Sequence, residues 1–464
     1  MGAKPKRHFR TPATAPGPTG GEMLRSFNQI RTDALGFLEW SWRTYGDVVQ
    51  FPIPTPPTYL VTHPEGVRRV LQANHRGYGK ATIQYRNLAL VTGEGLLAAD
   101  TDAWRRQRKS LQPAFHPRAV VAVADHAAQA SLRLADDWRA LGDGAVVDVE
   151  EAMMRTALEI VGAALFGADL RDDAAELVTA TQAGLSAVVA RTRNPLAPPL
   201  SVPTPGNLRL RRALARLNRA VAEIVAVRRS AASTDEPRDM LDVLLADGSM
   251  SSAELRDQIV TFIVAGHETV ASSLTWAWHL LGAHPEVAQA VAAEADEVLG
   301  ERVQARFDDL PALGRAAAVF DESLRLFPPG WLISRNALQD DEVLGHHIPA
   351  GALVLISPYL VHRHPAADPG ELRFDPDRFR NGPPSPVAGT YIPFGAGPRL
   401  CIGRDMARAE GTIVIAMLAR SFRLTPLPGH AVVANPMVML KPKGGLPMRL
   451  SKRTDSSTRL PRPD

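Results

Sequence analysis

The sequence predicts a mainly α-helical fold with small β-sheets, an α+β class, and two patterns carry this prediction. From Ala103 to about Val298 the chain is rich in alanine, leucine and arginine, with apolar residues three or four positions apart, as on one face of a helix. Nearer the start, Val48–Ile53 and Thr58–Val61 are short β-branched and aromatic runs on either side of a Pro-Thr-Pro-Pro turn. The second pattern predicts a hairpin in a small sheet.

Four further segments fill in this architecture. Glu342–Ile348 and Leu353–Ile356 are expected to be strands around a turn at residues 349–351. Residues 194–207 are dense in proline, which predicts a loop between two helices, either a surface connector or the cover of a buried lipophilic site. The proline- and glycine-rich stretch 375–403 is too long for a plain connection, so we expect it to be functional.

Composition excludes several classes of protein. The 464 residues include a single cysteine, which can form neither an intramolecular disulfide nor a zinc site of several thiolates. The formal net charge of +4 is too close to balance to indicate a nucleic-acid partner. Neither a signal-peptide core nor a membrane-spanning apolar run follows the basic start of the chain, so we expect no membrane anchor and a cytoplasmic location. Flexible ends are expected over residues 1–25 and 451–464.

The lone cysteine lies in a loop that is unusual in composition. The run from Phe394 to Gly403 holds Gly395, Gly397 and Pro398, and a helical pattern begins directly after it, near Arg404. Amide groups of the loop, the helix N-terminus and nearby arginines are expected to favour thiolate over thiol at Cys401. Such a thiolate is either a nucleophile or a metal ligand, and the loop favours both over a small buried hydrophobe.

A second motif lies in a long helical pattern from about Ser252 to Leu281. Apolar neighbours indicate that Glu268 and Thr269 enter a buried environment, and buried polar groups need a reason. Gly266 weakens the helix, and the Thr269 hydroxyl can bond back to the carbonyl of Ala265, so we expect a bulge or kink there that holds water and relays protons. The alternative is a partly exposed helix face with an accidental kink. His267 is expected to face away or bind nothing.

A third motif, Glu322 and Arg325, places opposite charges three positions apart on one helix face. By itself this pattern is typical of a solvated surface pair, which contributes under about 1 kcal/mol to stability.

Together and in this order, the three motifs resemble the cytochrome P450 family of haem-thiolate monooxygenases. Phe394, Gly397, Arg399, Cys401 and Gly403 match every fixed position of the family's cysteine signature, and the residues from Ala265 to Thr269 match its oxygen-activation motif. The resemblance also covers the Glu-x-x-Arg pair, a Pro-x-Arg-Phe segment with Arg378, and Trp104-x-x-x-Arg108. It implies the cytochrome P450 fold, with one haem domain over residues 26–450 and a long central helix across the haem.

The resemblance also implies roles for individual residues. Cys401 would be the axial thiolate ligand of the iron of haem b. A second group would bind or line the haem, the arginines and the tryptophan at its propionates: Trp104, Arg108, Ala265, Arg335, Phe394, Gly395, Arg399 and Gly403. Glu322, Arg325 and Arg378 would form a buried charge network that stiffens the haem side. Glu268 and Thr269 would be the catalytic pair that admits and orders protons.

The implied activity is insertion of one oxygen atom from O₂ into a lipophilic substrate such as a fatty acid, terpenoid or polyketide-like compound. Segments expected to line the substrate pocket are residues 83–90, 194–207, 332–333 and 437–439. No reductase domain is expected after the cysteine, so a ferredoxin or flavodoxin would supply electrons. Arg105, Arg106 and Lys109 form either the basic patch that docks it or a plain solvated basic face. The alternatives are a peroxide-driven peroxygenase and a haem-binding sensor or carrier without turnover.

Overall fold

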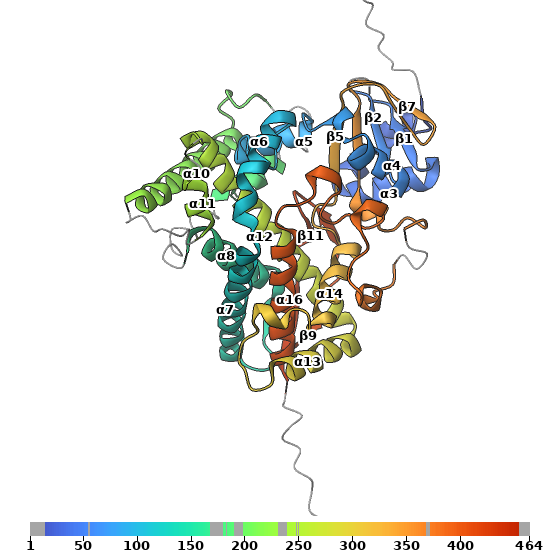
Figure 1. Ribbon diagram of the computed structural model, residues 1–464. Coiled ribbons are helices and arrows are strands. Elements are labelled where there is room, and N and C mark those ends of the chain that lie inside the picture. Colours follow the sequence, from blue (N-terminus) through green and yellow to red (C-terminus); the bar gives the residue numbers. More distant parts are fainter. Residues whose placement is uncertain are drawn as a thin grey trace, which may run out of the picture.

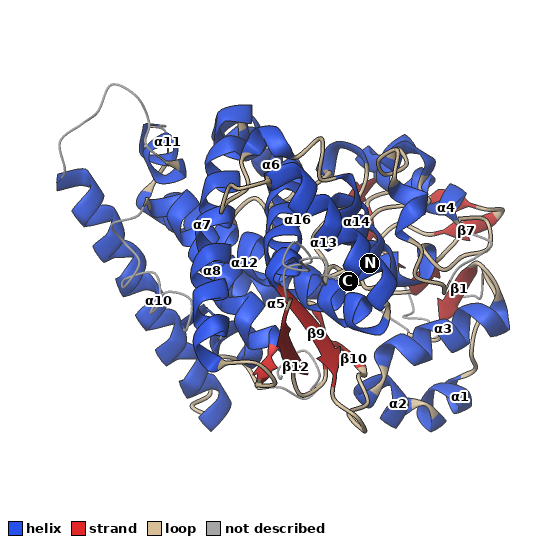
Figure 2. Cartoon of the chain, turned by 90° about the horizontal axis from the view of Figure 1, so that it is seen from below, coloured by secondary structure: helices blue, strands red, loops and turns tan. Residues whose placement is uncertain are grey.

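The computed structural model describes residues 14–53, 56–167, 180–181, 183–189, 198–230, 239–246, 248, 250–367 and 372–453. Long helices occupy one side and the centre of the molecule, and a strand-rich part with short helices occupies the other side (Figure 1). The cartoon in Figure 2 shows the same division from below. This arrangement confirms the predicted α+β class with small sheets.

The centre of the helical part is α12 (Ser252–Ala283), which packs against α8, α14 and α16. It begins with a capping box in which Ser251 and Glu254 each satisfy the other's backbone N–H, and it ends just before Pro285. The helix predicted from Ser252 is confirmed. The other helices of this part are α5 (Ile83–Thr92), α6 (Thr101–Leu111), α7 (Pro117–Leu141), α8 (Val149–Phe166), α10 (Pro205–Ser230), α11 (Met240–Ala246), α13 (Pro285–Leu299), α14 (Gly314–Leu326) and α16 (Arg404–Ser421).

The main sheet has the strand order β1-β2-β8-β5-β3, with bounds Val48–Phe51, Thr58–Val61, Leu353–Ile356, Ile333–Ala337 and Tyr78–Gly79. Strands β1 and β2 pair antiparallel with Val48 opposite Val61, which confirms the predicted hairpin. Strand β8 continues this sheet, parallel to β2 and antiparallel to β5. The short helices α1 (Gly20–Arg25), α2 (Phe27–Thr32), α3 (Ala34–Tyr45), α4 (Pro64–Arg68) and α15 (Pro358–Val361) complete this part.

The prediction of one strand over Glu342–Ile348 is wrong. The segment is a separate hairpin of β6 (Asp341–Val343) and β7 (His346–Ile348). Its two-residue turn has φ of 53° at Leu344 and 78° at Gly345, the left-handed geometry that tight hairpins require. A leucine at the first turn position hides this signal, because it is not a residue that the sequence pattern associates with such a turn.

A second small sheet interrupts the stretch that the sequence predicts to be helical. Strand β4 (Val146–Asp148) follows α7 and pairs with β12 (Pro447–Lys452), which in turn pairs with β9 (Phe422–Pro426). A last pair, β10 (Ala434–Pro436) and β11 (Leu440–Pro442), lies close to α12. These C-terminal strands bring residues far along the chain against α8 and α12.

The chain ends have more structure than expected. The hydroxyl group of Thr14 lies 2.7 Å from both the Tyr59 hydroxyl and the His347 carbonyl, and Gly20–Arg25 forms α1 under a capping box of Thr19 and Glu22. Residues 14–25 therefore depart from the flexible arm predicted over 1–25. Similarly, residues 451 and 452 belong to β12 instead of a loose tail. Residues 1–13 and 454–464 lie outside the described part of the chain.

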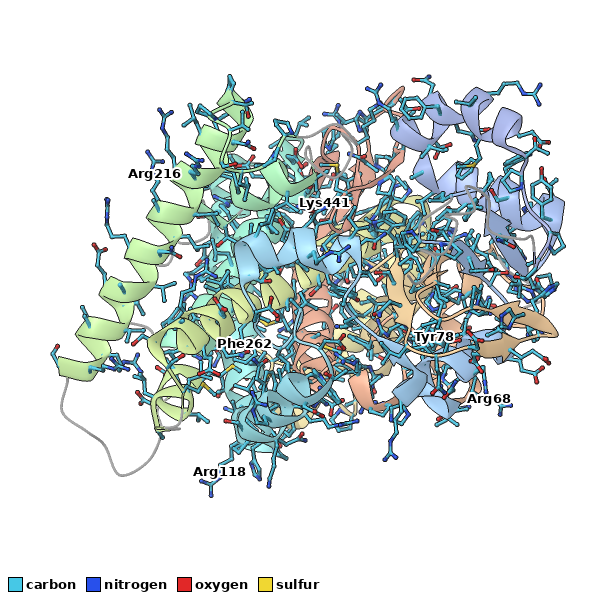
Figure 3. All side chains as sticks on the ribbon, turned by 90° about the horizontal axis from the view of Figure 1, so that it is seen from above. Arg68, Tyr78, Arg118, Arg216, Phe262 and Lys441 are labelled. Atoms are coloured by element: carbon cyan, nitrogen blue, oxygen red, sulfur yellow. The ribbon has the colours of Figure 1, made fainter. Side chains whose placement is uncertain are left out.

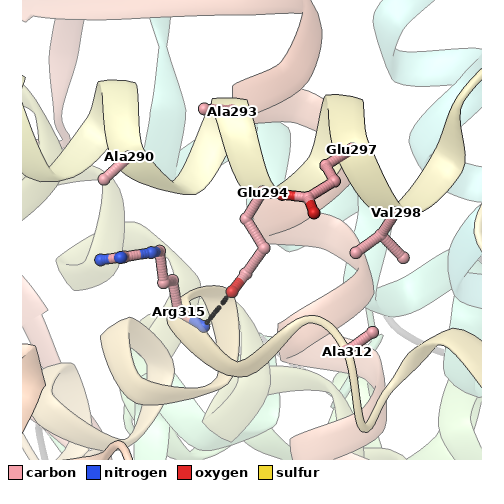
Figure 4. A pocket seen from close by; sticks show the side chains of 7 residues that line it. All are labelled: Ala290, Ala293, Glu294, Glu297, Val298, Ala312 and Arg315. Atoms are coloured by element: carbon pink, nitrogen blue, oxygen red, sulfur yellow. Dashed lines mark hydrogen bonds between the residues drawn. The ribbon is translucent and has the colours of Figure 1, made fainter.

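Helix α13 fixes the start of α14. The carboxylate of Glu294 accepts hydrogen bonds from the backbone N–H groups of Arg315 and Ala316, at 2.8 and 3.1 Å, beside a hollow between the two helices (Figure 4). A carboxylate in this position also interacts favourably with the helix dipole. None of the described helices is long and apolar enough to cross a membrane.

Candidate active site

The cysteine loop is held in shape by its glycines and its backbone. Gly395 and Gly397 have φ of 74° and 69°, and a Cβ on Gly397 would lie 2.1 Å from the carbonyl oxygen of Leu71, so only glycine fits there. The N–H of Cys401 donates to the carbonyl of Phe394 at 2.9 Å. Helix α16 begins three residues after the cysteine.

Cys401 lies in a recess of the protein. Its side chain has exposed surface, yet protein atoms surround it closely enough that burial raises the pKa of the thiol. The Gly403 N–H and the charges of Arg108 and Arg404 act in the opposite direction without outweighing burial. The prediction that the loop favours thiolate is therefore wrong for the protein atoms alone. A coordinated metal ion deprotonates such a thiol outright, so the donor fits a metal-thiolate bond.

Three cations converge beside this loop, and we refer to Lys80, Arg335 and Arg399 as the cation cluster. Burial and repulsion from Arg335 lower the pKa of Arg399 to about 10, and the pKa of Lys80 is also lowered by burial and by both arginines. Arg399 pairs with Asp100 at 2.9 Å. Lys80 donates to the carbonyl of Leu97 and stands over the Tyr85 ring, and Arg335 donates to the carbonyl of Ser334.

A cluster of three cations and one acid attracts further negative charge. Two carboxylates of a haem group satisfy that need, and a single thiol donor matches a haem-thiolate site, so the residues present fit haem. Lys80 is absent from the set predicted from sequence. It follows a two-residue strand, β3, and no motif marks it; the structure reveals it because β3 pairs with β5, which carries Arg335.

Trp104 and Arg108 lie on one face of α6. The Arg399 guanidinium stands over the Trp104 ring, 4.6 Å from its centroid. Arg108 instead donates to the Leu400 carbonyl at 2.9 Å and lies close enough to Cys401 for the thiolate charge to act on its pKa. The structure thus brings Trp104 to the cation cluster and places Arg108 on the backbone of the cysteine loop.

Helix α12 presents two different faces at its motif. Ala265 and Thr269 are half-buried, and the Thr269 hydroxyl donates to the Ala265 carbonyl at 2.5 Å, as expected. The helix nevertheless stays α-helical throughout, so the predicted bulge does not break it. Ile402 of the cysteine loop packs against the same hydrophobic cluster as Phe262 of α12. The loop and α12 therefore share one apolar cluster.

The other face of α12 carries Glu268 and His267, both buried. His267 donates from Nε2 to the carbonyl of Met154 in α8 at 3.0 Å. It therefore faces away from Ala265 and Thr269, as one of the two expectations had it, but it does have a hydrogen-bond partner. Burial lowers its pKa to about 4, which keeps the imidazole neutral at neutral pH. Glu268 pairs with Lys441 of β11, with 3.6 Å between Oε1 and Nζ.

Glu322, Arg325 and Arg378 form what we call the closed network. Glu322 is 0% exposed and its carboxylate lies 2.6 Å from Arg325 Nε and 3.3 Å from Arg378 Nε. It also accepts the N–H of Asp375 at 2.9 Å. The pair of α14 is thus buried, unlike the surface pair that its spacing alone suggests.

A histidine links the closed network to Ile392, two residues before the cysteine loop. His362 donates from Nδ1 to the carbonyl of Arg325 at 3.0 Å and accepts the N–H of Ile392 at its Nε2, 2.9 Å away. These two bonds require a neutral ring, and burial lowers the pKa of His362 to about 3. Sequence reasoning missed this residue, because its two partners lie 37 and 30 positions away in the chain.

The segments predicted to line a lipophilic pocket separate into two groups. Leu88, Leu200 and Val438 pack against the hydrophobic cluster of α12 that includes Phe262 (labelled in Figure 3). Leu332 and Ile333 pack in two other clusters, next to the main sheet. Of the predicted loop 194–207, residues 194–197 lie outside the described part, and the helix α10 already begins at Pro205, one of the positions that proline favours in a helix.

A recessed thiol on a glycine loop, an acid–alcohol pair on the helix across from it and a cation cluster define a haem-thiolate, oxygen-activating class of protein. The chain belongs to the cytochrome P450 family: the family model described as "Cytochrome P450" matches residues 15–447. It is a cytochrome P450 monooxygenase, an oxidoreductase of a family that binds haem iron.

Characterised relatives extend over nearly the full length of the chain. Cyclooctatin synthase from Streptomyces melanosporofaciens is 36% identical over 94% of both chains. Pentalenene oxygenase from Streptomyces avermitilis is 32% identical over 97% of this chain and 99% of that protein. The solved structure of CYP175A1 from Thermus thermophillus is 32% identical, covers 94% of this chain and 99% of that chain, and superimposes with a TM-score of 0.75.

Proposed function

We propose that the chain binds haem b through Cys401 and inserts one oxygen atom from O₂ into a terpenoid-like, lipophilic substrate. The observation that carries the proposal is the recessed Cys401 thiol beside the cation cluster. Bound haem would supply the redox chemistry that activates O₂. Replacing Cys401 with alanine should abolish the red-shifted Soret band of the reduced carbonyl complex. Persistence of that band in the variant would overturn the assignment.

In this proposal the residues around the cysteine bind and orient the haem. Lys80, Arg335 and Arg399 hold the two propionates, and the Trp104 indole N–H is a further donor to them. Arg108 steadies the cysteine loop through the Leu400 carbonyl. Ala265 of α12 and Phe394, Gly395 and Gly403 of the loop would line the haem site.

Glu268 and Thr269 manage protons in the proposed reaction. The Thr269 hydroxyl, half-buried on α12, orders water at the site, and Glu268 passes protons to it from outside. Replacing Thr269 with alanine should leave electron consumption in place and reduce the yield of product per electron pair. A variant with unchanged coupling would remove this role. Turnover by hydrogen peroxide alone, with no reductant, would instead support a peroxygenase.

The names of two relatives guide the substrate proposal. Pentalenene oxygenase and cyclooctat-9-en-7-ol 5-monooxygenase are named for cyclic, largely hydrocarbon substrates, and they are 32% and 35% identical to this chain. The apolar cluster beside α12 suits such compounds better than small polar ones. Pentalenene should shift the Soret band towards the high-spin position at lower concentration than a fatty acid of equal carbon number. The reverse order would exclude the terpenoid class.

A separate ferredoxin or flavodoxin is the proposed electron donor. A hollow of about 700 Å³ beside α6 is lined by Arg105 and Lys109 as well as by Trp104 and Arg108, so basic side chains reach the surface next to the cysteine-loop side of this helix. These basic side chains would attract an acidic electron donor. The rate at which that donor reduces the protein should therefore fall as salt is added. A rate independent of ionic strength would exclude electrostatic docking.

Cytoplasmic location and a single haem domain over residues 26–450 belong to the same proposal. Cell fractionation tests the location, and limited proteolysis tests the single domain.

A further inference from the structure

Two histidines and one aspartate from three segments of the chain meet in the strand-rich part of the molecule. Asp47 lies between α3 and β1, His63 lies between β2 and α4, and His364 follows α15. A nitrogen of each histidine and a carboxylate oxygen of Asp47 all lie within 4.8 Å of one another. We refer to these three residues as the histidine cluster. Figure 1 shows α3, α4, β1 and β2 together, on the opposite side of the molecule from α10.

Backbone contacts fix the positions of the three residues. The carbonyl of Asp47 accepts the N–H of the residue before His63 at 3.0 Å, which holds these two segments together. The Nδ1 of His63 accepts the Glu65 N–H at 3.1 Å. The Nδ1 of His364 accepts the Ala366 N–H at 3.0 Å. The fold therefore assembles the histidine cluster, and a bound ion would not have to bring its residues together.

The Asp47 carboxylate is a charged and accessible donor. Because its Nδ1 accepts an N–H, neutral His364 carries its proton on Nε2 and donates it to Asp47 Oδ1, 3.0 Å away. The Trp42 indole N–H donates to the same oxygen at 3.1 Å. Burial alone would raise the pKa of Asp47, but these hydrogen bonds outweigh burial and lower it, so the carboxylate is ionised at neutral pH. The Asp47 side chain is 38% exposed, so ions can reach it from solvent.

The types of donor atom select the kind of metal ion. Two imidazoles and one carboxylate are ligands that Zn²⁺ prefers, whereas Mg²⁺ and Ca²⁺ prefer oxygen ligands alone. Three protein ligands leave the fourth position of a tetrahedron for water. Water can occupy it from the exposed side of Asp47.

Metal binding requires a change of hydrogen bonds at both rings. A neutral imidazole binds a metal through one nitrogen and carries its proton on the other. An ion at His364 Nε2 therefore moves the ring proton to Nδ1, and the bond from the Ala366 N–H is lost. At His63 the use of either nitrogen ends the bond from the Glu65 N–H. Glu65 and Ala366 are both exposed, so water can replace the lost acceptors.

We propose that the histidine cluster binds one Zn²⁺ ion through Asp47, His63 and His364, and that this ion ties the hairpin of β1 and β2 to the segment after α15. Asp47 and His364 are 317 positions apart in the chain, so the ion would join distant segments of the folded protein. An ion that binds only the folded chain stabilises it. The inference does not rest on the proposed oxygen insertion, because it uses other residues.

Calorimetric titration of the haem-loaded enzyme with Zn²⁺ tests the site. The wild type should bind one equivalent, and Asp47→Asn and His63→Asn should each weaken that binding by about a hundredfold or more, since each removes a ligand. The asparagine of His63→Asn can still cap α4, so this variant removes the imidazole and keeps the cap. The matched control is His347→Gln, which removes an exposed histidine of β7 and should bind zinc as the wild type does. Absence of saturable binding, or equal affinity in the two variants and the control, would overturn the proposal.

X-ray absorption at the zinc edge distinguishes the ion from haem iron and reports its ligands. Two imidazoles and oxygen ligands at about 2.0–2.1 Å are expected. Zinc should also raise the unfolding temperature of the haem-loaded wild type, and a chelator should reverse the rise. The rise should be absent from His63→Asn, and Mg²⁺ should not produce it. A spectrum without imidazole neighbours would place the ion outside the histidine cluster and overturn the proposal.

Discussion

In the closed network both arginines reach the carboxylate of Glu322, whereas in the cation cluster Lys80 and Arg335 donate to the backbone carbonyls of Leu97 and Ser334, and Lys80 also stands over the Tyr85 ring. Both groups are built largely from arginine in the protein interior. The closed network is satisfied by the chain itself, so its function is to hold α14 to the segment around Asp375. The three cations of the cation cluster repel one another, so the cluster is suited to bind a negatively charged ligand. Partner chemistry, not residue type, separates a structural site from a binding site.

The largest expected effect comes from opening the closed network. Glu322→Ala leaves Arg325 as a buried charge without its carboxylate, which should cost about 3–5 kcal/mol of the free energy of unfolding. Urea unfolding of the haem-free chain measures this loss. The control is Glu39→Ala, which removes a partly exposed pair with Arg43 on α3 and should cost under about 1 kcal/mol. Equal losses in the two variants would show that the closed network is no more than a surface pair.

Removing a charged residue from the cation cluster should have the opposite effect on the stability of the haem-free chain. Arg335→Met removes a charge that repels Arg399 and Lys80, so the haem-free chain should unfold with equal or greater free energy. Haem affinity should fall by about ten- to a hundredfold, the equivalent of one charged hydrogen bond. Haem transfer to an acceptor globin, followed by absorbance, gives the affinity. A destabilised haem-free chain with unchanged haem affinity would make Arg335 part of the fold instead.

Acid should weaken the closed network through His362. Burial lowers the pKa of His362 to about 3 in the folded chain. Below about pH 6.5 the histidine is therefore protonated in the unfolded chain but stays neutral in the folded chain, so the free energy of unfolding falls as pH falls. Between pH 7 and pH 5 the expected loss is about 2 kcal/mol from this residue. His362→Gln should remove that share of the pH dependence, while His267, with a pKa of about 4, keeps its own. An unchanged pH slope in the variant would show that His362 does not titrate on unfolding.

The sequence predicts well what depends on neighbours along the chain. The helix from Ser252, the hairpin of β1 and β2 and the Thr269 back-bond are all local, and the structure contains each of them. The sequence predicts poorly what depends on distant contacts. Lys80 meets Arg335 only through the pairing of β3 with β5, and Lys441 meets Glu268 only because β11 lies on α12.

The protonation state of the cysteine shows the same limit. Its loop has the glycines and neighbouring arginines that favour a thiolate, and these groups do lower the pKa of Cys401. Burial depends on everything packed around the loop, and it raises the pKa by more. A sequence pattern reports the nearby charges and amides but not the depth of the site.

The smallest expected effect on stability comes from an exposed ion pair, which belongs to neither the closed network nor the cation cluster. Arg105 on α6 pairs with Asp102, and both side chains are more than half exposed, at 57% and 80%. Arg105→Gln should therefore change the free energy of unfolding by under about 0.5 kcal/mol.

If the outer face of α6 receives an acidic electron donor, the same variant should slow reduction of the protein by that donor a few-fold at low salt and not at high salt. Arg139→Gln, which removes a similar exposed pair with Asp136 on α7, is the control and should leave the rate unchanged. Equal rates for both variants at low salt would place the donor on another face, because a charge at a docking site changes association even where it leaves stability untouched.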